Sequence, residues 1–211
     1  MPAWPASVWS LLAVNFWALT GVLSFGWDVF VLGFVYWAEN AVIGVVNLPR
    51  LALARPSDGE GRGIAEKCVA LPFFVFHFGV FTTVHGFVIS ALWKSFGGGT
   101  APGAPAGLFT LLGTEPLARS WPLWTAVALL LVSHGHSLVL NTILREEGRR
   151  VTVKQQMKAP YTRVLVMHLA VFVGAAGVLL AGLPRLFTAG LVFLKMGLDV
   201  HFHLRERARL Q

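Results

Sequence analysis

Long apolar runs separated by short polar or Gly/Pro-rich stretches dominate this chain. Each run has about 20 residues, the length an α-helix needs to cross roughly 30 Å of hydrocarbon. The pattern predicts membrane-spanning helices over residues 7–25, 29–48, 69–93, 122–144, 161–182 and 184–204. Residues 1–211 then form one transmembrane domain, an all-α polytopic helix bundle with about six transmembrane helices.

The stretches between these runs carry the residues that break helices. A tight turn is expected at Gly26-Trp27-Asp28, a polar Gly-rich loop over 50–67, and a long irregular connection over 94–120. Proline is favoured at the first position of a helix, where its missing N–H has no intrahelical partner to lose. Helix starts are therefore predicted at Pro122, Pro160 and Pro184.

Composition also indicates a membrane protein. Hydrophobic residues make up 55% of the 211 residues and charged residues only 13%, and the mean hydropathy is +0.67. Because roughly a quarter of the residues in a soluble domain are charged, a soluble helical domain does not fit. Cys68 is the single cysteine, which excludes an intramolecular disulfide and any CxxC motif.

The formal net charge of +7 has a topological explanation. With six spans, most of the 17 Lys and Arg residues fall on the side that holds both termini and the loops around 50–67 and 145–163. The positive-inside rule assigns that side, and hence both termini, to the cytoplasm. Because the basic residues gather at helix ends, we expect the lipid bilayer as the partner and no nucleic acid.

Five of the predicted spans each contain one ionisable residue at a similar depth: Glu39, His77, His134, His168 and Asp199. Such residues are expensive in hydrocarbon, and they usually face the interior of a helix bundle. At about 1.5 Å per residue, the first three lie near the membrane midplane and the last two in the cytoplasmic half. We therefore predict one shared polar centre inside the membrane.

Other polar residues lie where they could support this centre. Candidates for handling protons or orienting its groups are His85, Lys195, Asn15, Asn40 and Asn141. In the sixth span Lys195, Asp199 and His203 recur at successive helical turns. Lys195 and Asp199 could therefore pair with each other on that helix.

Short polar motifs recur in the second to sixth spans: Tyr36-Trp37-Ala38-Glu39-Asn40, His77-Phe78-Gly79, His85-Gly86, Ser133-His134-Gly135, Asn141, Pro160-Tyr161, Arg163, His168, Lys195, Gly197-Leu198-Asp199 and His203-Leu204-Arg205-Glu206. Together, over roughly residues 14–206, they resemble a family of bacterial integral membrane proteins catalogued as domain of unknown function 6498. The resemblance implies a helical bundle in the bacterial inner (plasma) membrane and gives weight to the polar positions. It implies no reaction, because the family has no assigned activity.

Four interpretations of the polar centre follow. The preferred one is a metal site, because imidazole and carboxylate suit zinc, iron or copper. Its ligands would be Glu39, His77, His134, His168 and Asp199. Such a protein could be a membrane metalloenzyme acting on a lipidic or membrane-embedded substrate. The absence of an HExxH motif and of the histidine clusters of membrane desaturases weighs against it.

The other interpretations need no such ligand set. A b-type haem could be held by two histidines on facing helices, either His77 with His134 or His85 with His168. A proton-coupled small-solute transporter or channel without a metal is the third, because histidine titrates near neutral pH. The fourth is a structural polar core, in which buried groups only hydrogen-bond one another and fix the helix register. The sequence leaves this choice open.

Overall fold

The computed structural model describes residues 6–57, 63–96, 120–144, 150–161, 164–165, 188–198 and 200. Over these ranges the backbone is helical apart from short connections and one isolated parallel bridge between Arg55 and Thr152. The prediction of an all-α chain is therefore confirmed for the part of the chain that is described. Its elements are α1 (Ala6–Ser24), α2 (Val29–Leu53), α3 (Gly63–Phe96), α6 (Trp121–Ser137), the π-helical stretch η2 (Leu138–Leu144), and the helices 153–161 and Thr188–Leu198.

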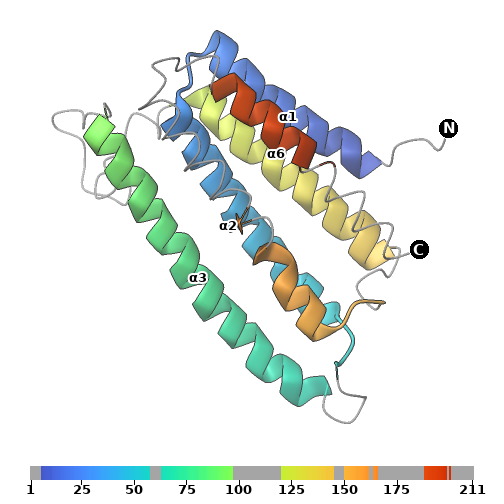
Figure 1. Ribbon diagram of the computed structural model, residues 1–211. Coiled ribbons are helices and arrows are strands. Elements are labelled where there is room, and N and C mark those ends of the chain that lie inside the picture. Colours follow the sequence, from blue (N-terminus) through green and yellow to red (C-terminus); the bar gives the residue numbers. More distant parts are fainter. Residues whose placement is uncertain are drawn as a thin grey trace.

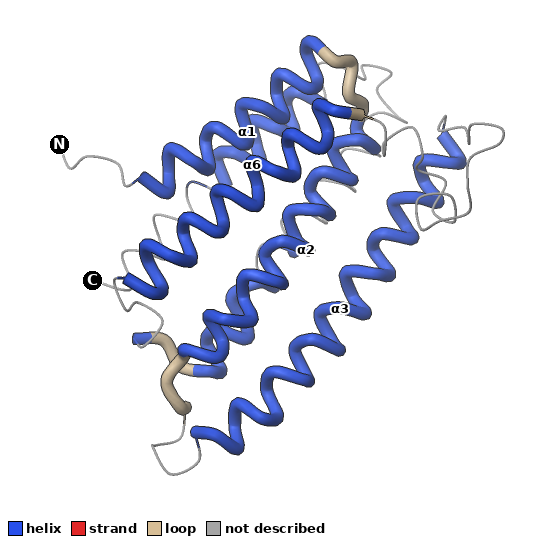
Figure 2. Tube along the Cα trace, turned by 180° about the vertical axis from the view of Figure 1, so that it is seen from behind, coloured by secondary structure: helices blue, strands red, loops and turns tan. Residues whose placement is uncertain are grey.

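Four helices lie side by side in the order α1, α6, α2 and α3 (Figures 1 and 2). α2 is the central helix, because it packs against α3 on one side and against α6 on the other. Apolar side chains of α1, α2 and α6 fill one core, which includes Val22, Leu32 and Leu123. A second core joins the end of α2 to α3 and to helix 153–161 through Leu51, Phe74 and Val153.

The connection between α1 and α2 forms the tight turn that the sequence predicts. Gly26 has a positive φ of 69°, which suits a residue without a side chain. Trp27 folds back into the core and is buried. Asp28 then caps α2, because its carboxylate accepts hydrogen bonds from the backbone N–H groups of Phe30 and Val31, both at 2.9 Å.

Two helices are longer than the sequence predicts. The predicted end of α2 is at residue 48, whereas the helix continues through Pro49. The predicted start of α3 is at residue 69, whereas the helix already begins at Gly63 and contains Pro72. A proline costs one backbone hydrogen bond, and membrane helices tolerate that loss where neighbouring groups satisfy the freed carbonyl.

Within the described residues, three helices are long and apolar enough to cross a membrane: Val29–Leu53, Gly63–Ala91 and Trp121–Leu144. The last of these combines α6 and η2 and matches the predicted span over 122–144. Pro122 lies in the first turn of α6, as the sequence predicts. α1 and Thr188–Leu198 fall within the predicted first and sixth spans.

The predicted fifth span over 161–182 lies largely outside the described residues, as does Pro184. The sequence predicts a helix start at Pro160, but the structure places this proline inside a helix that already begins at residue 153. A capping box sets the start of that helix instead. The backbone N–H of Gln155 donates to Thr152 Oγ1 at 3.3 Å, and the backbone N–H of Thr152 donates to Gln155 Oε1 at 3.0 Å.

α3 contacts α2 closely at two glycines. A Cβ added at Gly44 would lie 2.5 Å from the Phe78 ring, and a Cβ at Gly86 would lie 3.0 Å from the Trp37 indole. The Trp37 indole N–H also donates to the Thr82 carbonyl oxygen at 2.8 Å. The outer face of α3 carries large exposed apolar side chains, as a lipid-facing helix would: Ile64, Val69, Phe73, Phe76, Val80, Val84 and Phe87.

Candidate functional site

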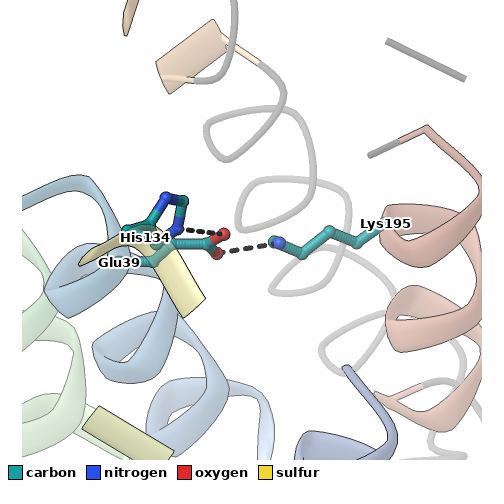
Figure 3. A network of polar contacts seen from close by, with 3 residues as sticks. All are labelled: Glu39, His134 and Lys195. Atoms are coloured by element: carbon teal, nitrogen blue, oxygen red, sulfur yellow. Dashed lines mark ion pairs between the residues drawn. The ribbon is translucent and has the colours of Figure 1, made fainter. Parts of the chain in front are cut away.

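Glu39, His134 and Lys195 meet inside the bundle, each from a different helix (Figure 3). Lys195 Nζ lies 2.8 Å from Glu39 Oε2. On the other carboxylate oxygen, His134 Nε2 lies 3.8 Å from Glu39 Oε1. All three residues are buried. The Glu39 carboxylate therefore stands between an ammonium group and an imidazole, away from solvent.

The local structure of α2 explains why Lys195 reaches across to this helix. Tyr36 lies about one turn before Glu39, on the same face of α2. Lys195 Nζ lies 4.8 Å from the centroid of the Tyr36 ring. A lysine ammonium over an aromatic face is held by the ring quadrupole. Tyr36 and Glu39 thus hold the same ammonium from successive turns of α2.

This contact gives Lys195 a more central place than the sequence indicates. The sequence makes it a supporting residue that could pair with Asp199 on its own helix. In the structure its ammonium contacts the Glu39 carboxylate directly, and Asp199 lies outside the described residues. A signal was present, because Lys195 is the one Lys or Arg well inside the predicted sixth span. A charge at that depth needs an opposite charge nearby.

Further buried polar residues lie on α1 and on the helices that form the centre. Asn15 comes from α1, Asn40 from α2 and Ser133 from α6, and each is buried. Thr188 is buried at the start of the helix that carries Lys195. The orienting role expected for Asn15 and Asn40 stays a prediction. Asn141 lies in η2, and its side chain is outside the described residues.

Two predicted histidines lie on α3 and make other contacts. His77 is exposed, and its ring stacks on Phe73 with centroids 5.3 Å apart. Its ring also lies 5.8 Å from that of Tyr161. His85 is half-buried, and its Nδ1 lies 2.6 Å from the Phe81 carbonyl oxygen. None of these contacts involves Glu39 or His134.

The metal interpretation predicts five ligands in one place. Glu39 and His134 are the two that the structure brings together, while His168 and Asp199 lie outside the described residues. Within the described ranges, no group of three His, Cys, Asp or Glu residues is arranged to hold a metal ion. One oxygen of Glu39 already contacts the Lys195 ammonium. The positive charge of this ammonium opposes the binding of a divalent cation at the same carboxylate.

A second set of polar contacts lies toward the end of α2, and the sequence interpretation missed it. Arg50 Nη2 donates to Ser137 Oγ at 3.1 Å, which links α2 to α6. Gln156 Nε2 donates to Asn47 Oδ1 at 2.6 Å, and Asn47 Nδ2 donates to the Gln156 carbonyl oxygen at 3.4 Å. Helical phase could have found Arg50, because it lies about three turns after Glu39 on nearly the same face.

The long apolar helices and the buried ionisable centre indicate a helical membrane protein with polar groups inside its bundle. The sequence model described as a family of unknown function (DUF6498) matches residues 3–211, so the chain belongs to this family. The resemblance stated from the motifs is confirmed by this match. No curated protein and no solved structure matches the chain.

Proposed function

We propose that this protein is a proton-conducting membrane transporter or channel, with Glu39, His134 and Lys195 as its proton-binding centre. The observation that carries the proposal is the position of the Glu39 carboxylate, between a lysine from one helix and a histidine from another. Ionisable residues buried among membrane helices commonly mark ion pathways and proton relays. Here Lys195 and His134 both contact Glu39.

His134 is the member of the centre that can change its charge near neutral pH. With a neutral imidazole, Glu39 and Lys195 balance each other's charge as an ion pair. A proton taken up by His134 adds a second cation beside the same carboxylate. His134 then competes with Lys195 for Glu39, so proton uptake weakens the contact between the carboxylate and the ammonium.

This competition couples protonation to helix packing. Glu39 belongs to α2, His134 to α6 and Lys195 to helix Thr188–Leu198. A change of ionic partner at Glu39 therefore changes which helix α2 is held against. Two packings that differ in their ionic contacts are the kind of bistable arrangement that a ligand or proton can bias. Such an arrangement favours the transport interpretation over that of a purely structural polar core.

Proton flux into proteoliposomes tests the proposal. Purified protein is reconstituted with a pH-sensitive dye inside, and a potassium diffusion potential drives protons inward. Wild-type protein should acidify the lumen faster than protein-free liposomes, and His134→Gln should abolish the difference. His136→Gln is the matched control, because His136 is exposed and lies on α6 close to His134. Equal flux in wild type and His134→Gln would contradict the proposal.

The same assay separates transport from a purely structural polar core. The double variant Glu39→Gln/Lys195→Met removes both charges of the ion pair together, so that no unpaired charge remains buried. If the centre were only structural, this variant would fold without any other consequence. We expect it to elute as a monodisperse species in size-exclusion chromatography and to have lost proton flux.

A membrane metalloenzyme is the second candidate, and the specific observation in its favour is the pair Glu39 and His134. Their Oε1 and Nε2 atoms lie 3.8 Å apart, and carboxylate with imidazole is a donor set that suits zinc, iron or copper. His168 and Asp199 would have to complete the site. Metal analysis of the purified protein separates this candidate from the transporter.

We also propose six spans with both termini in the cytoplasm of a bacterial inner membrane. One contact supports the grouping of basic segments on one side. The backbone N–H of Arg55 donates to the Val151 carbonyl oxygen at 3.0 Å, and the Val153 N–H donates to the Arg55 carbonyl oxygen at 3.0 Å. The loop after α2 and the segment before helix 153–161 therefore share one end of the bundle. The exposed Lys154 and Lys158 lie on that helix.

A further inference from the structure

The Arg50 side chain brings a polar group close to the buried centre. Along α2, Arg50 lies about three turns, or roughly 16 Å, from Glu39. Its guanidinium nevertheless donates to Ser137 Oγ at 3.1 Å, and Ser137 lies only about one turn beyond His134 on α6. Helix side chains lean toward the N-terminus, and Arg50 uses that direction to reach back into the α2/α6 interface.

The same end of the bundle holds the other buried polar pair. Asn47 and Gln156 are both buried and exchange two hydrogen bonds between α2 and helix 153–161. Charged groups surround this end: among the residues that the structure describes they are Arg50, Arg55, Glu66, Lys67, Arg150, Lys154 and Lys158. Six of these seven are basic, so the local potential is positive.

The opposite end of the same interface is apolar. Between the start of α6 and His134 the buried side chains include Leu123, Ala126 and Leu130. On α2, Val31, Leu32 and Val35 are buried before Tyr36 and Glu39. These residues belong to one continuous apolar core, and apolar constrictions exclude water and ions.

Aromatic rings add to this apolar end. Trp121 at the start of α6 has its ring 5.5 Å from that of Phe25 and 6.4 Å from that of Trp17. The Trp17 indole N–H also donates to the Pro122 carbonyl oxygen at 3.0 Å. Aromatic contacts and a hydrogen bond therefore tie α1 to the beginning of α6, at the end of α6 farthest from Ser137.

From this contrast we infer that the Glu39–His134–Lys195 centre is reached from one membrane face only, along the α2/α6 interface, and that Arg50 and Ser137 form the entrance. The inference rests on the proposed function and adds the direction of access and the kind of species admitted. The permanent charge of Arg50 favours water and small anions over cations. Protons would exchange between this water and His134.

Cysteine accessibility tests the route without any transport assay. The test variant is Ser137→Cys in a Cys68→Ser background, because Cys68 is exposed and is the single native cysteine. The matched control is Ala126→Cys, about three turns earlier on nearly the same face of α6, where the residue is buried in the apolar core. Lys154→Cys, at an exposed position, marks the Arg50 side.

Intact vesicles of both orientations are treated with membrane-impermeant methanethiosulfonates, one anionic and one cationic. Ser137→Cys should react from the same side as Lys154→Cys and about tenfold faster than Ala126→Cys, since thiol reactivity follows exposure. The anionic reagent should react roughly 25-fold faster than the cationic one, because a charge about 4 Å away in water speeds the first and slows the second by roughly fivefold each. Adding Arg50→Gln should remove this preference.

Two results would overturn the inference: labelling of Ser137→Cys no faster than that of Ala126→Cys, or labelling from the side opposite to Lys154→Cys. If Ser137→Cys does not fold, Ser133→Cys on the same helix replaces it and is held to the same outcomes. The result of this labelling test is independent of the result of the proton-flux test. Correct labelling without proton flux would retain the entrance and reject the transporter, and flux with the wrong labelling would do the reverse.

Discussion

Glu39 and Lys195 form an ion pair whose Oε2 and Nζ atoms lie 2.8 Å apart, with side chains only 9% and 6% exposed. The two residues are far apart in sequence, and their helices meet at this contact. A buried pair adds little net stability over an apolar replacement, whereas removal of one partner leaves an uncompensated charge. We therefore infer that the pair helps to set how helix Thr188–Leu198 packs against α2.

We expect removal of one charge alone to lower the free energy of unfolding more than removal of both charges together. Lys195→Met should destabilise the protein by about 3–5 kcal/mol, because the Glu39 carboxylate loses its ammonium partner. In the double variant Glu39→Gln/Lys195→Met this penalty should largely disappear. Thermal unfolding in detergent provides the comparison, with Lys158→Met as the exposed control. Additive losses in the double variant would show that the two residues do not act as a pair.

Two hydrogen bonds between the Asn47 side chain and Gln156 help to join helix 153–161 to α2. We expect Asn47→Ala to destabilise the protein by about 1–3 kcal/mol, because the Gln156 amide would be left buried without its oxygen partner. Hydrogen exchange of the backbone amides over 153–161 should accelerate in this variant. Lys154→Ala, an exposed change on the same helix, should leave exchange unchanged. Equal exchange in all three proteins would refute this role for Asn47.

The α2/α3 contact should respond strongly to a methyl group at one glycine and hardly at all at another. A Cβ at Gly44 would lie 2.5 Å from the Phe78 ring, whereas one at Gly79 would meet nothing within 4 Å. Gly44→Ala should therefore cost about 1–3 kcal/mol through overpacking. Gly79→Ala should be neutral or slightly stabilising, since alanine favours helix. Unfolding midpoints in detergent measure both, and equal shifts would contradict this packing.

Hydrophobic periodicity was sufficient to predict the main helices but not all of their ends. The starts of α1, α2 and α6 follow from apolar runs bounded by turn residues such as Gly26 and Asp28. Pro49 and Pro160 mislead, because a single lost hydrogen bond does not end a helix that is held by packing on its neighbours. At helix 153–161 the local capping box, not the proline, decides where the helix begins.

The depth of the site could be predicted from the sequence, but only some of its residues could. The sequence points to Glu39 and His134, because each interrupts a long apolar run and an ionisable group is costly to bury in a membrane. The same argument treats His77 alike, although it lies on the exposed face of α3. Which residues pair depends on which helices are neighbours, and the hydrophobic pattern of the sequence does not contain that information. Lys195 therefore becomes central only when α2 and helix Thr188–Leu198 are seen together.

The charge asymmetry predicts that the connection over 94–120 lies on the side opposite to helix 153–161. A reporter enzyme active only outside the cytoplasm should be active when inserted in this connection and inactive when fused to the C-terminus. The physical reason is that basic loop segments resist translocation, and the Arg55 and Val151 contact places two such segments together. Activity of the C-terminal fusion, with none from the insertion, would invert the topology.

Metal content decides between the two candidate functions. We expect detergent-purified protein to hold no more zinc, iron, copper or manganese than its His134→Ala variant, because the Lys195 ammonium beside Glu39 opposes a divalent cation. Elemental analysis after expression in metal-supplemented medium gives the comparison, and His136→Ala controls for adventitious binding to an exposed histidine. A near-stoichiometric metal that is lost in His134→Ala and kept in His136→Ala would establish a metalloprotein. An accompanying Soret band would identify haem, whereas a metal without it would return His168 and Asp199 to the list of ligands.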